Sequence, residues 1–365
     1  PINTGSTATY ALWLVGNLNN IEVRDCKILA DTTVTTSYFY AIYKTNVGVA
    51  NDIRIISNEI RGGYRGMYIY GGINTTTYGT NLVVDSNLIW GQYYYAAYLY
   101  YADFKSFSNN IILSRIANQG ASWYGIYFNY CNYKANANKV HQRSQSITRP
   151  YLAYTNYASS YNTTKRSLFS NNELIGFATS TAYGIYANYS NLDIYNNSIL
   201  LQGSGGSRGI HVGGNTTYVT DCKNNNITNY STAGYPIYVN TAGTYSGDYN
   251  NFYSASSYVG YYSGNKTSLS DWVTASSQDQ NSVRIQPVFA GDSTQSLKLF
   301  DYTGLACPVL SAVATDIEGT VRAGSTAMGA YTVYPLQLDA ATVEVENISA
   351  TVLIGQNYSV NVVIA

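Results

Sequence analysis

Charge is scarce in this chain. Only 11% of the 365 residues are charged, and 20 basic and 20 acidic side chains give a formal net charge of zero. An average soluble protein has about 25% charged residues. The sequence has neither the basic stripe of a nucleic-acid-binding protein nor the Lys/Arg-rich face of a membrane-surface helix. No apolar run approaches the roughly 18 residues of a membrane span, so we expect no nucleic acid and no membrane span.

Cysteine and histidine are also rare. The four cysteines form no C-x-x-C pair, which argues against zinc binding and redox chemistry. Cys26 and Cys222 lie in the same phrase, "DCK", and we expect them at equivalent sites of two distant repeats, as free thiols that pack like small apolar side chains. Two isolated histidines, His141 and His211, make a poor metal site. We therefore expect no metal and no cofactor.

Tyrosine is abundant, with 40 residues, and much of it lies in a repeated four-residue phrase such as "YGIY". The phrase recurs at intervals of 23 to 32 residues, beginning at Tyr10, Tyr40, Arg65, Tyr95, Tyr124, Tyr151, Tyr183, Arg208, Tyr235 and Tyr258. A second phrase built on asparagine follows in most intervals, as "SNEI", "SNLI", "NNII", "NNEL", "NNSI", "NNNI" and "NNFY".

Both phrases sit in segments that alternate apolar and polar residues, as strands do, and are rich in β-branched and aromatic residues. Such repeats fit the coils of a parallel β-helix, in which each coil buries its apolar face against its neighbours. The variable intervals favour the right-handed form, whose turns accommodate loops of different length. We predict an all-β fold, a right-handed parallel β-helix (solenoid) of about ten coils over residues 1–262. The third residue of each "YGIY" phrase should face the core, and the asparagines should hydrogen-bond from coil to coil at a corner.

Residues 263–335 follow a different pattern. A stacked sheet leaves an exposed edge, so we expect the last coils and a C-terminal cap here. Two motifs stand out here. The first, "L-x-D-W … Q-D-x-N-S-x-x-x-x-P-x-F", is formed by Leu269, Asp271, Trp272, Asp279, Asn281, Ser282, Pro287 and Phe289. The second contains a D-x-x-G-x-x-R segment followed by "M-G-A-Y", and is formed by Asp316, Gly319, Arg322, Gly329, Ala330 and Tyr331. They resemble the terminal segment of bacterial secreted right-handed parallel β-helix repeat proteins. The resemblance implies a segment that closes the end of the helix, and Asp316 and Arg322 are candidates to pair there.

Residues 336–365 change again. The alternation in "ATVEVENI" and "YSVNVVI" predicts two strands joined by "GQN". The segment resembles the start of an immunoglobulin-like module of large cell-surface proteins of the Bacteroidetes type. About 30 residues are too few for a complete sandwich of about 100 residues, so we expect a partial β-sandwich-like segment, cut within its next domain.

Many right-handed β-helix proteins act on polysaccharides, and a glycosidase needs two carboxylates about 5–9.5 Å apart. Here the acidic residues of the coils are spread about one per coil, no two aspartates are adjacent, and no acid cluster suits calcium. The sequence identifies no catalytic residue. One set of basic residues forms either a small basic spot or solvated loops: Arg61, Arg65, Lys139, His141, Arg143 and Arg149.

The candidate binding surface is aromatic. If the third residue of each phrase faces inward, the fourth faces outward. The fourth position is held by Trp13, Tyr43, Tyr68, Tyr98, Tyr127, Tyr154, Tyr186, His211, Tyr238 and Tyr261. Such a stripe either stacks on itself and stiffens the solenoid, or offers a platform to sugar rings or to a protein.

Three functions remain open on this basis. The first is a non-catalytic module of a large secreted or bacterial cell-surface protein, with an adhesive or rigid-stalk role. The second is glycan binding through the aromatic stripe, with extracellular polysaccharides or surface glycans as partners besides other domains of the same chain. The third is a polysaccharide lyase or glycoside hydrolase acting on an extracellular polysaccharide, which rests on analogy of fold. The sequence favours a non-enzymatic, extracellular role.

Overall fold

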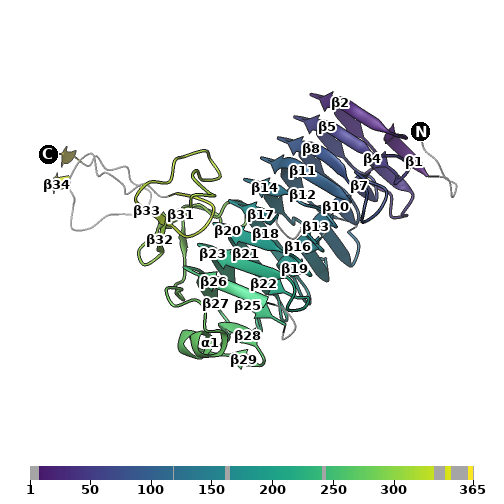
Figure 1. Cartoon of the computed structure of the whole chain (residues 1–365). Helices are drawn as coiled ribbons and strands as arrows, with labels where there is room; N and C mark the ends of the chain where they lie inside the picture. Colours follow the sequence, from purple (N-terminus) through teal and green to yellow (C-terminus); the bar gives the residue numbers. More distant parts are fainter. Residues whose placement is uncertain are drawn as a thin grey trace. The chain divides into compact units, whose positions relative to one another are not determined.

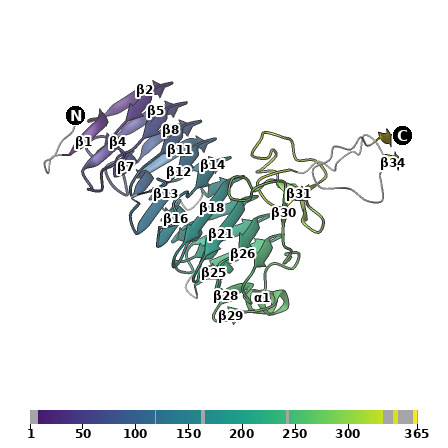
Figure 2. The same ribbon diagram turned by 180° about the vertical axis from the view of Figure 1, so that it is seen from behind.

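The computed structural model describes residues 8–117, 119–160, 165–240 and 244–332, together with strands at 342–346 and 361–364. The chain divides into two compact units, residues 1–332 and 333–365, and each is described by itself. The first unit is built on three long sheets, which we call A, B and C. Figures 1 and 2 show their strands stacked in chain order, seen from opposite sides.

The strands of each sheet are given in stacking order. Sheet A contains β1 (Thr9–Leu14), β4 (Phe39–Lys44), β7 (Arg65–Tyr70), β10 (Tyr95–Tyr100), β13 (Ser122–Asn129), β16 (Arg149–Asn156), β19 (Tyr183–Asn188), β22 (Arg208–Val212), β25 (Tyr235–Val239), β28 (Gly260–Tyr262) and β29 (Asn265–Lys266). Sheet B contains β2 (Leu18–Arg24), β5 (Ala50–Ile56), β8 (Gly79–Asp85), β11 (Ala102–Ser108), β14 (Lys134–Asn136), β17 (Ser167–Ser170), β20 (Leu192–Tyr195), β23 (Val219–Lys223) and β26 (Thr244–Asp248). Sheet C contains β3 (Lys27–Leu29), β6 (Glu59–Arg61), β9 (Leu88–Trp90), β12 (Ile111–Leu113), β15 (Lys139–His141), β18 (Glu173–Ala178), β21 (Ser198–Gly203), β24 (Asn226–Asn229) and β27 (Asn251–Ser254). The remaining elements are α1 (Leu269–Ser276), β30 (Val288–Phe289), β31 (Leu299–Asp301), β32 (Ala306–Pro308), β33 (Ser325–Ala327), β34 (Thr342–Glu346) and β35 (Asn361–Ile364).

The chain visits sheets A, B and C in turn and then begins the next coil, so each strand pairs in parallel with the strand three places along the chain. This is the all-β parallel β-helix that the repeats predict. In the described residues, sheets B and C have nine strands each, which makes eight full turns from the first strand to the last, slightly fewer than the ten coils expected. The difference arises at the last phrase, because β28 pairs with β29 in an antiparallel hairpin and no further coil follows.

The interior consists of columns of side chains at matching positions. Ile126 is in register with Ala153, and the column continues through Ile185, Ile210 and Ile237. None of these side chains is more than 4% exposed. Burial of one Ile contributes roughly 1.5–3 kcal/mol, so stacking the coils supplies stability that no single coil has alone. The prediction that the third residue faces the core is confirmed.

An asparagine ladder runs through the corner between sheets B and C. Its members are at most 2% exposed: Asn58, Asn87, Asn110, Asn138, Asn172, Asn197, Asn225 and Asn250. Each side-chain oxygen from the second rung on accepts the backbone N–H and the side-chain amide of the preceding rung, at 2.9–3.1 Å. The predicted coil-to-coil hydrogen bonding is confirmed, and every side-chain amide of the ladder has partners.

The residue before each ladder asparagine turns the corner. Its φ lies between 52° and 59° along the whole ladder, in the left-handed region. Asparagine adopts this region more readily than most residues, because its short side chain hydrogen-bonds locally. Serine, alanine and tyrosine also occupy the position, at Ser57, Ser86, Ala137 and Tyr249. The corner therefore explains the small polar residues that precede most of the ladder asparagines.

Helix α1 closes the end of the solenoid. It starts after Ser268, whose hydroxyl accepts the N–H of Asp271 at 3.0 Å and so caps the first turn. The ring of Trp272 is fully buried, with Tyr245, Phe252 and Tyr262 around it at centroid distances of 5.7, 5.9 and 6.2 Å. The aromatic residue of the L-x-D-W motif therefore covers the last interior layer.

Asp279 terminates the asparagine ladder. One carboxylate oxygen accepts the side-chain amide of Asn250 at 3.0 Å and the hydroxyl of Ser282 at 2.6 Å. The other accepts the hydroxyl of Tyr245 at 2.6 Å and the indole N–H of Trp272 at 2.8 Å. Burial raises the pKa of Asp279, although these four donors oppose the effect. The Q-D-x-N-S motif therefore supplies the acceptor that a ninth asparagine would have provided.

The segment after the cap lies against the side of the solenoid. Leu297 and Tyr331 are buried against Ile175 and Leu200 on the outer face of sheet C. Glu173 fixes the contact, since one of its oxygens accepts the N–H of Leu297 at 2.8 Å and the hydroxyl of Tyr331 at 2.6 Å. Figure 1 shows this segment, in yellow-green, beside β18 and β21. The expectation that the D-x-x-G-x-x-R segment closes the end is wrong: helix α1 closes the end and this segment covers a side.

Arg322 is a buried clamp in that segment. Its guanidinium donates to the side-chain oxygen of Asn171 at 2.8 Å and to the carbonyl of Gly329 at 2.9 Å. Asp316 instead accepts backbone N–H groups, including that of Thr332 at 2.8 Å. Within the described residues no ion pair joins Asp316 and Arg322, so their expected pairing is wrong. Arg322 pairs with carbonyls because the covering segment presents them along its edge.

The cysteines are free thiols. Cys131, Cys222 and Cys307 are buried, as expected, whereas Cys26 is exposed at the corner before β3. The N–H of Cys26 donates to Asn58 at 3.0 Å, so Cys26 holds the first position of the ladder. Cys222 lies inside β23 and faces the core beside Ile194. The two "DCK" phrases are therefore not equivalent, contrary to the expectation.

In the second unit, β34 and β35 form an antiparallel pair, which agrees with the two strands predicted from alternation. The rest of the immunoglobulin-like segment expected over 336–365 lies outside the described residues.

Candidate functional site on the outer face of sheet A

The predicted aromatic stripe is a single column on sheet A. Each member is in register with the next across the parallel strands: Trp13, Tyr43, Tyr68, Tyr98, Tyr127, Tyr154, Tyr186, His211, Tyr238 and Tyr261. We call this column row 2. Most of its members are half-buried, but Trp13 is 55% exposed and His211 is 5% exposed. All ten residues are therefore brought together, and whether they bind a ligand stays a prediction.

A second column lies beside row 2 and was not among the predicted site residues. Row 1 consists of the first residues of the repeated phrases: Tyr10, Tyr40, Arg65, Tyr95, Tyr124, Tyr151, Tyr183, Arg208, Tyr235 and Tyr258. In the strand phrases, the second and third residues both face the core, so the first and fourth both face outward. Strict alternation would have buried the first residue. The signal was present in the sequence, as a ring at both ends of "YGIY".

The rings of row 1 lie flat on one another. Tyr124 and Tyr151 are 4.6 Å apart with an interplanar angle of 2°, and Tyr151 and Tyr183 are 4.6 Å apart at 0°. Each ring face in this part of the row is therefore covered by the next ring. The stacks follow from the strand spacing of about 4.8 Å, which places equivalent rings at contact distance.

The rings of row 2 are tilted in the middle of the solenoid. Tyr98 and Tyr127 lie 4.7 Å apart at 58°, and Tyr127 and Tyr154 lie 4.7 Å apart at 79°. Tyr154 and Tyr186 follow at 4.8 Å and 44°. A tilted ring covers only part of its neighbour, so half-exposed ring faces and edges meet the solvent here. Rows 1 and 2 together form what we call the tyrosine face.

Hydroxyl groups are part of the tyrosine face. The hydroxyls of Tyr98 and Tyr100 are 2.7 Å apart, and Tyr70 stacks on Tyr100 at 4.7 Å. Burial raises the pKa of Tyr98 and of Tyr127 above the ordinary value of tyrosine, and neighbouring tyrosines add to the effect. Their hydroxyls therefore stay protonated at physiological pH, and each can donate as well as accept a hydrogen bond.

Two arginines interrupt row 1, and both are held by rings. The Arg65 guanidinium lies 4.7 Å from the Tyr68 centroid and donates to the Tyr40 hydroxyl at 2.6 Å. Arg208 lies 3.8 Å from the Tyr238 centroid and 3.1 Å from Nδ1 of His211. Burial, with help from the Arg208 charge, lowers the pKa of His211 to about 3. His211 is therefore a neutral ring of the stack at physiological pH.

A third set of tyrosines lies at the corner between sheets A and B. Tyr101, Tyr130, Tyr157 and Tyr189 have φ between 46° and 53° and continue the stacking, for example Tyr130 on Tyr157 at 4.5 Å and 7°. Tyrosine is unusual in the left-handed region. The sequence predicts that the tyrosine-rich runs containing Tyr101 and Tyr130 widen the aromatic patch, but it does not place these residues at a corner, because nothing in their local phrase marks one.

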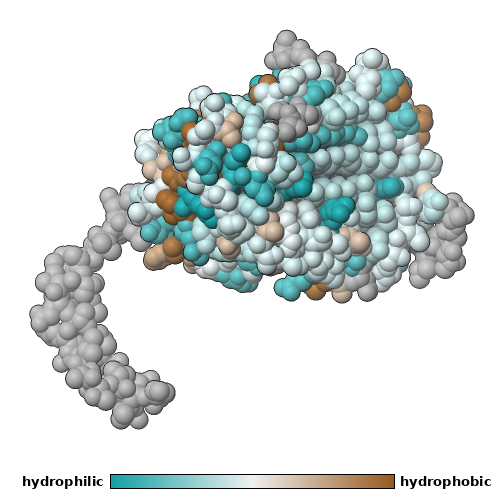
Figure 3. Space-filling view, turned by 90° about the horizontal axis from the view of Figure 1, so that it is seen from below, coloured by the Kyte–Doolittle hydropathy of each residue, from teal (hydrophilic) through white to brown (hydrophobic). Residues whose placement is uncertain are grey.

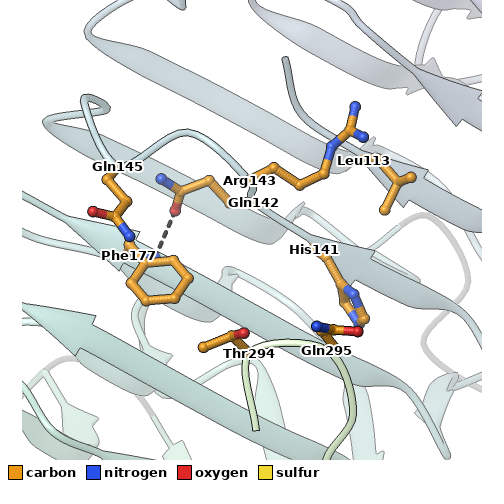
Figure 4. Close-up of a pocket in the computed structure, with 8 residues that line it drawn as sticks. All are labelled: Leu113, His141, Gln142, Arg143, Gln145, Phe177, Thr294 and Gln295. Atoms are coloured by element: carbon orange, nitrogen blue, oxygen red, sulfur yellow. Dashed lines mark hydrogen bonds between the residues drawn. The ribbon is translucent and has the colours of Figure 1, made fainter. Parts of the chain in front are cut away.

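Polysaccharide cleavage needs positioned acid and base groups. Among the described residues there is one histidine–carboxylate pair, in which Nε2 of His141 is 2.8 Å from Oε1 of Glu173. Burial opposes ionisation of Glu173, but the bonds from His141, Leu297 and Tyr331 prevail and lower its pKa. His141 lines a cavity of about 450 Å³ on sheet C, drawn in Figure 4. Glu173 is fully buried beneath the covering segment and belongs to its anchor.

In the part of the chain that the structure describes, no group of three or more His, Cys, Asp or Glu side chains is arranged to hold a metal ion. Across the same residues, no helix has the length and apolar character to cross a membrane. Comparisons of this chain with models of protein families, with curated proteins and with solved structures gave no match. The fold and the surface geometry are therefore the grounds on which a function can be assigned.

Proposed function

We propose that this chain is a non-catalytic module of a secreted or bacterial cell-surface protein, in which a rigid β-helix displays the tyrosine face to extracellular glycans. The observation that supports the proposal is the in-register column of rings on sheet A, most of which are partly exposed. Exposed apolar patches often mark binding sites.

The chemistry of the tyrosine face suits neutral sugars. A sugar ring offers C–H groups to an aromatic face and hydroxyls to hydrogen-bonding partners, and the tilted rings around Tyr127 and Tyr154 provide both. Figure 3 shows that pale, weakly polar residues form long rows on one side of the molecule, with only small brown apolar patches. The tilted part of row 2 has no charged member, so it has no local field that would select an ionic ligand there. We place the binding segment on the tilted part of row 2.

A rigid-stalk role requires no ligand, and the flat stacks of row 1 favour it. Stacked rings contribute about 0.5–1.5 kcal/mol per pair, so they stiffen the solenoid whether or not a glycan binds. The enzymatic alternative, a polysaccharide lyase or glycoside hydrolase, has one observation in its favour, the His141–Glu173 pair beside a cavity.

The test is a binding measurement on a glycan array, followed by affinity electrophoresis in gels that contain the best neutral polysaccharide. Tyr127→Ala and Tyr154→Ala should reduce retardation by the polysaccharide, because each removes a tilted ring. Tyr127→Phe should retain stacking and lose hydroxyl contacts, so its loss should be smaller. Tyr302→Ala is the matched control, since Tyr302 is half-buried and lies outside the tyrosine face.

The outcomes separate the three roles. Binding that both alanine variants weaken, with no turnover, supports the proposal. No binding to any glycan, with lower stability of the alanine variants, contradicts it and leaves the stalk role. Release of reducing or unsaturated ends that His141→Ala abolishes would favour the enzymatic alternative.

A further inference from the structure

A groove on the outer face of sheet C has features that neither the fold nor the tyrosine face requires. The covering segment hides β18 and β21, and the earlier strands of the sheet stay open beside it. Two adjacent cavities of about 450 and 420 Å³ lie there, and both are lined by Arg143. One outward-facing column of sheet C runs along both cavities. It consists of Arg61, Trp90, Leu113 and His141, which are in register on β6, β9, β12 and β15.

Three guanidinium groups line the smaller cavity, two of them beside the Trp90 indole and the third, that of Arg115, over the Tyr93 ring. Arg61 and Arg143 lie 5.5 and 6.0 Å from the Trp90 ring centroid. Arg115 is only 5% exposed and is fixed by bonds to the carbonyls of Gly91 at 2.7 Å and of Gly63 at 3.2 Å. Its Nη1 atom is buried and has no hydrogen-bond partner, and the same is true of Nε of Arg61. These donors are held in place and unused.

No carboxylate neutralises the three arginines within 4.0 Å in the described residues. The nearby acids form their close contacts with other groups, although the Asp31 charge acts on Arg115 from a longer distance. Glu59 accepts the indole N–H of Trp90 at 3.2 Å and lies 3.9 Å from Lys27. Asp31 accepts the N–H and the hydroxyl of Thr33 at 2.7 and 2.8 Å. In a chain with so few charges, two arginines at the Trp90 ring and a third beside them, over the Tyr93 ring, indicate a site for an anion.

Apart from Arg143 and His141, the larger cavity has uncharged walls, several of them hydrogen-bonding. Figure 4 shows His141 close to Gln295 and the Arg143 side chain extending away from them. Arg143 also lines the smaller cavity. Gln142 is held by the N–H of Phe177 at 2.7 Å, and the half-buried Phe177 ring forms one wall. Amides, a hydroxyl and a ring are the groups that bind an uncharged part of a sugar. The two cavities therefore offer one half with three arginines and one half lined mainly by uncharged groups, joined at Arg143, to one extended ligand.

We propose that this groove binds a polysaccharide made of uronic acids, with one carboxylate on Arg61, Arg115 and Arg143 and the next sugar unit in the cavity beside His141. Carboxylates match the planar fork of a guanidinium, and Trp90 gives the sugar ring a face to stack on. The expected basic spot is thus divided: Arg61, His141 and Arg143 share the groove, whereas Arg65 and Arg149 lie on sheet A. A nucleic acid would need cationic contacts beyond the groove, and the mainly uncharged second cavity does not supply them.

The experiment is isothermal titration of the full chain with polygalacturonate oligomers at low ionic strength. Arg61→Gln and Arg143→Gln should each weaken binding about ten- to a hundredfold, the range expected for loss of a charge-assisted bidentate contact. Arg149→Gln is the matched control, since Arg149 is exposed on sheet A, and it should bind like the parent. Circular dichroism verifies that each variant is folded.

Methyl-esterified oligomers of the same length are the matched ligand control and should bind at least tenfold more weakly. Equal affinity for the ester, no binding of the acid, or unchanged affinity of both groove variants would each overturn the proposal. Tighter binding of oligothymidylate of equal charge would also overturn it and assign the groove to nucleic acid. The groove and the tyrosine face lie on different sheets, so Tyr154→Ala should leave this binding unchanged, and failure of one proposal does not entail failure of the other.

Discussion

Replacing one asparagine of the ladder should lower the free energy of unfolding of the solenoid far more than replacing the asparagine that precedes it in the chain. The change is Asn197→Ala, in the middle of the ladder. The Asn197 oxygen accepts the backbone N–H and the amide of Asn172 at 2.9 and 3.0 Å. Its amide donates to Asn225 at 3.0 Å and to the carbonyl of Phe169 at 2.9 Å. The side chain is fully buried, so water cannot replace these partners.

The magnitude follows from the groups left behind. The backbone N–H of Asn172 loses its acceptor in a buried site, at a cost of about 1–3 kcal/mol. The other lost bonds contribute about 0.5–1.5 kcal/mol each. Because the effects overlap, we expect the free energy of unfolding to fall by about 3–6 kcal/mol.

The control is Asn196→Ala, one residue earlier. Asn196 is equally buried, but its side-chain amide has no hydrogen-bond partner, and Ala137 already occupies the equivalent corner position. The expected loss is therefore about 1 kcal/mol, from the left-handed φ alone. Guanidinium chloride unfolding followed by far-UV circular dichroism compares the two variants. Equal midpoints for Asn197→Ala and Asn196→Ala would refute the ladder as a source of stability.

Three further perturbations test other parts of the molecule. Asp279→Asn should lower the free energy of unfolding by about 2–4 kcal/mol, because the NH2 group of the new amide would face the donating groups of Trp272 and Tyr245. Hydrogen exchange should show faster opening of β25–β27 and unchanged opening of β4–β6. Gly329→Ala places a Cβ 2.6 Å from Oγ of Ser198 at φ +104°, so limited proteolysis should cut the covering segment earlier than in the parent. The pKa of His211 is lowered to about 3 in the folded state, so as the pH falls the unfolded chain takes up the proton before the folded chain does. Stability should therefore fall as the pH drops below about 6.5. His211→Tyr should lose that part of the pH dependence, as measured by urea unfolding at pH 7 and pH 5.

The fold could be predicted because the coils repeat. Each "YGIY" phrase places an aliphatic residue at the same depth, so the column through Ile126, Ile185 and Ile237 follows from spacing alone. The ladder could be predicted from the asparagine phrases in the sequence, but Asn138 did not fit them because the residue before it is Ala137. What repeats in sequence repeats in space, because every coil meets the same neighbours.

The surface was harder to predict, because it depends on contacts between distant segments. The covering segment meets Glu173 across a separation of more than a hundred residues, and no local pattern gives that pairing. Row 1 was missed because two successive residues of the phrase face inward, which alternation does not allow. Arg115 lines the sheet C groove, but it lies in a loop without any sequence motif, so this placement could not be predicted.

The most direct test of the stacked-coil account is the distance between spin labels placed along row 2. One label is fixed at Tyr43→Cys, and the other is moved to Tyr154→Cys, Tyr186→Cys or Tyr238→Cys, with Cys26→Ser removing the exposed thiol. These positions lie four, five and seven strands from β4 in sheet A, so at about 4.8 Å per strand the distances should be roughly 19, 24 and 34 Å. Double electron–electron resonance that shows this steady increase supports a solenoid with one aromatic column. Distances that do not grow with the number of coils would contradict it.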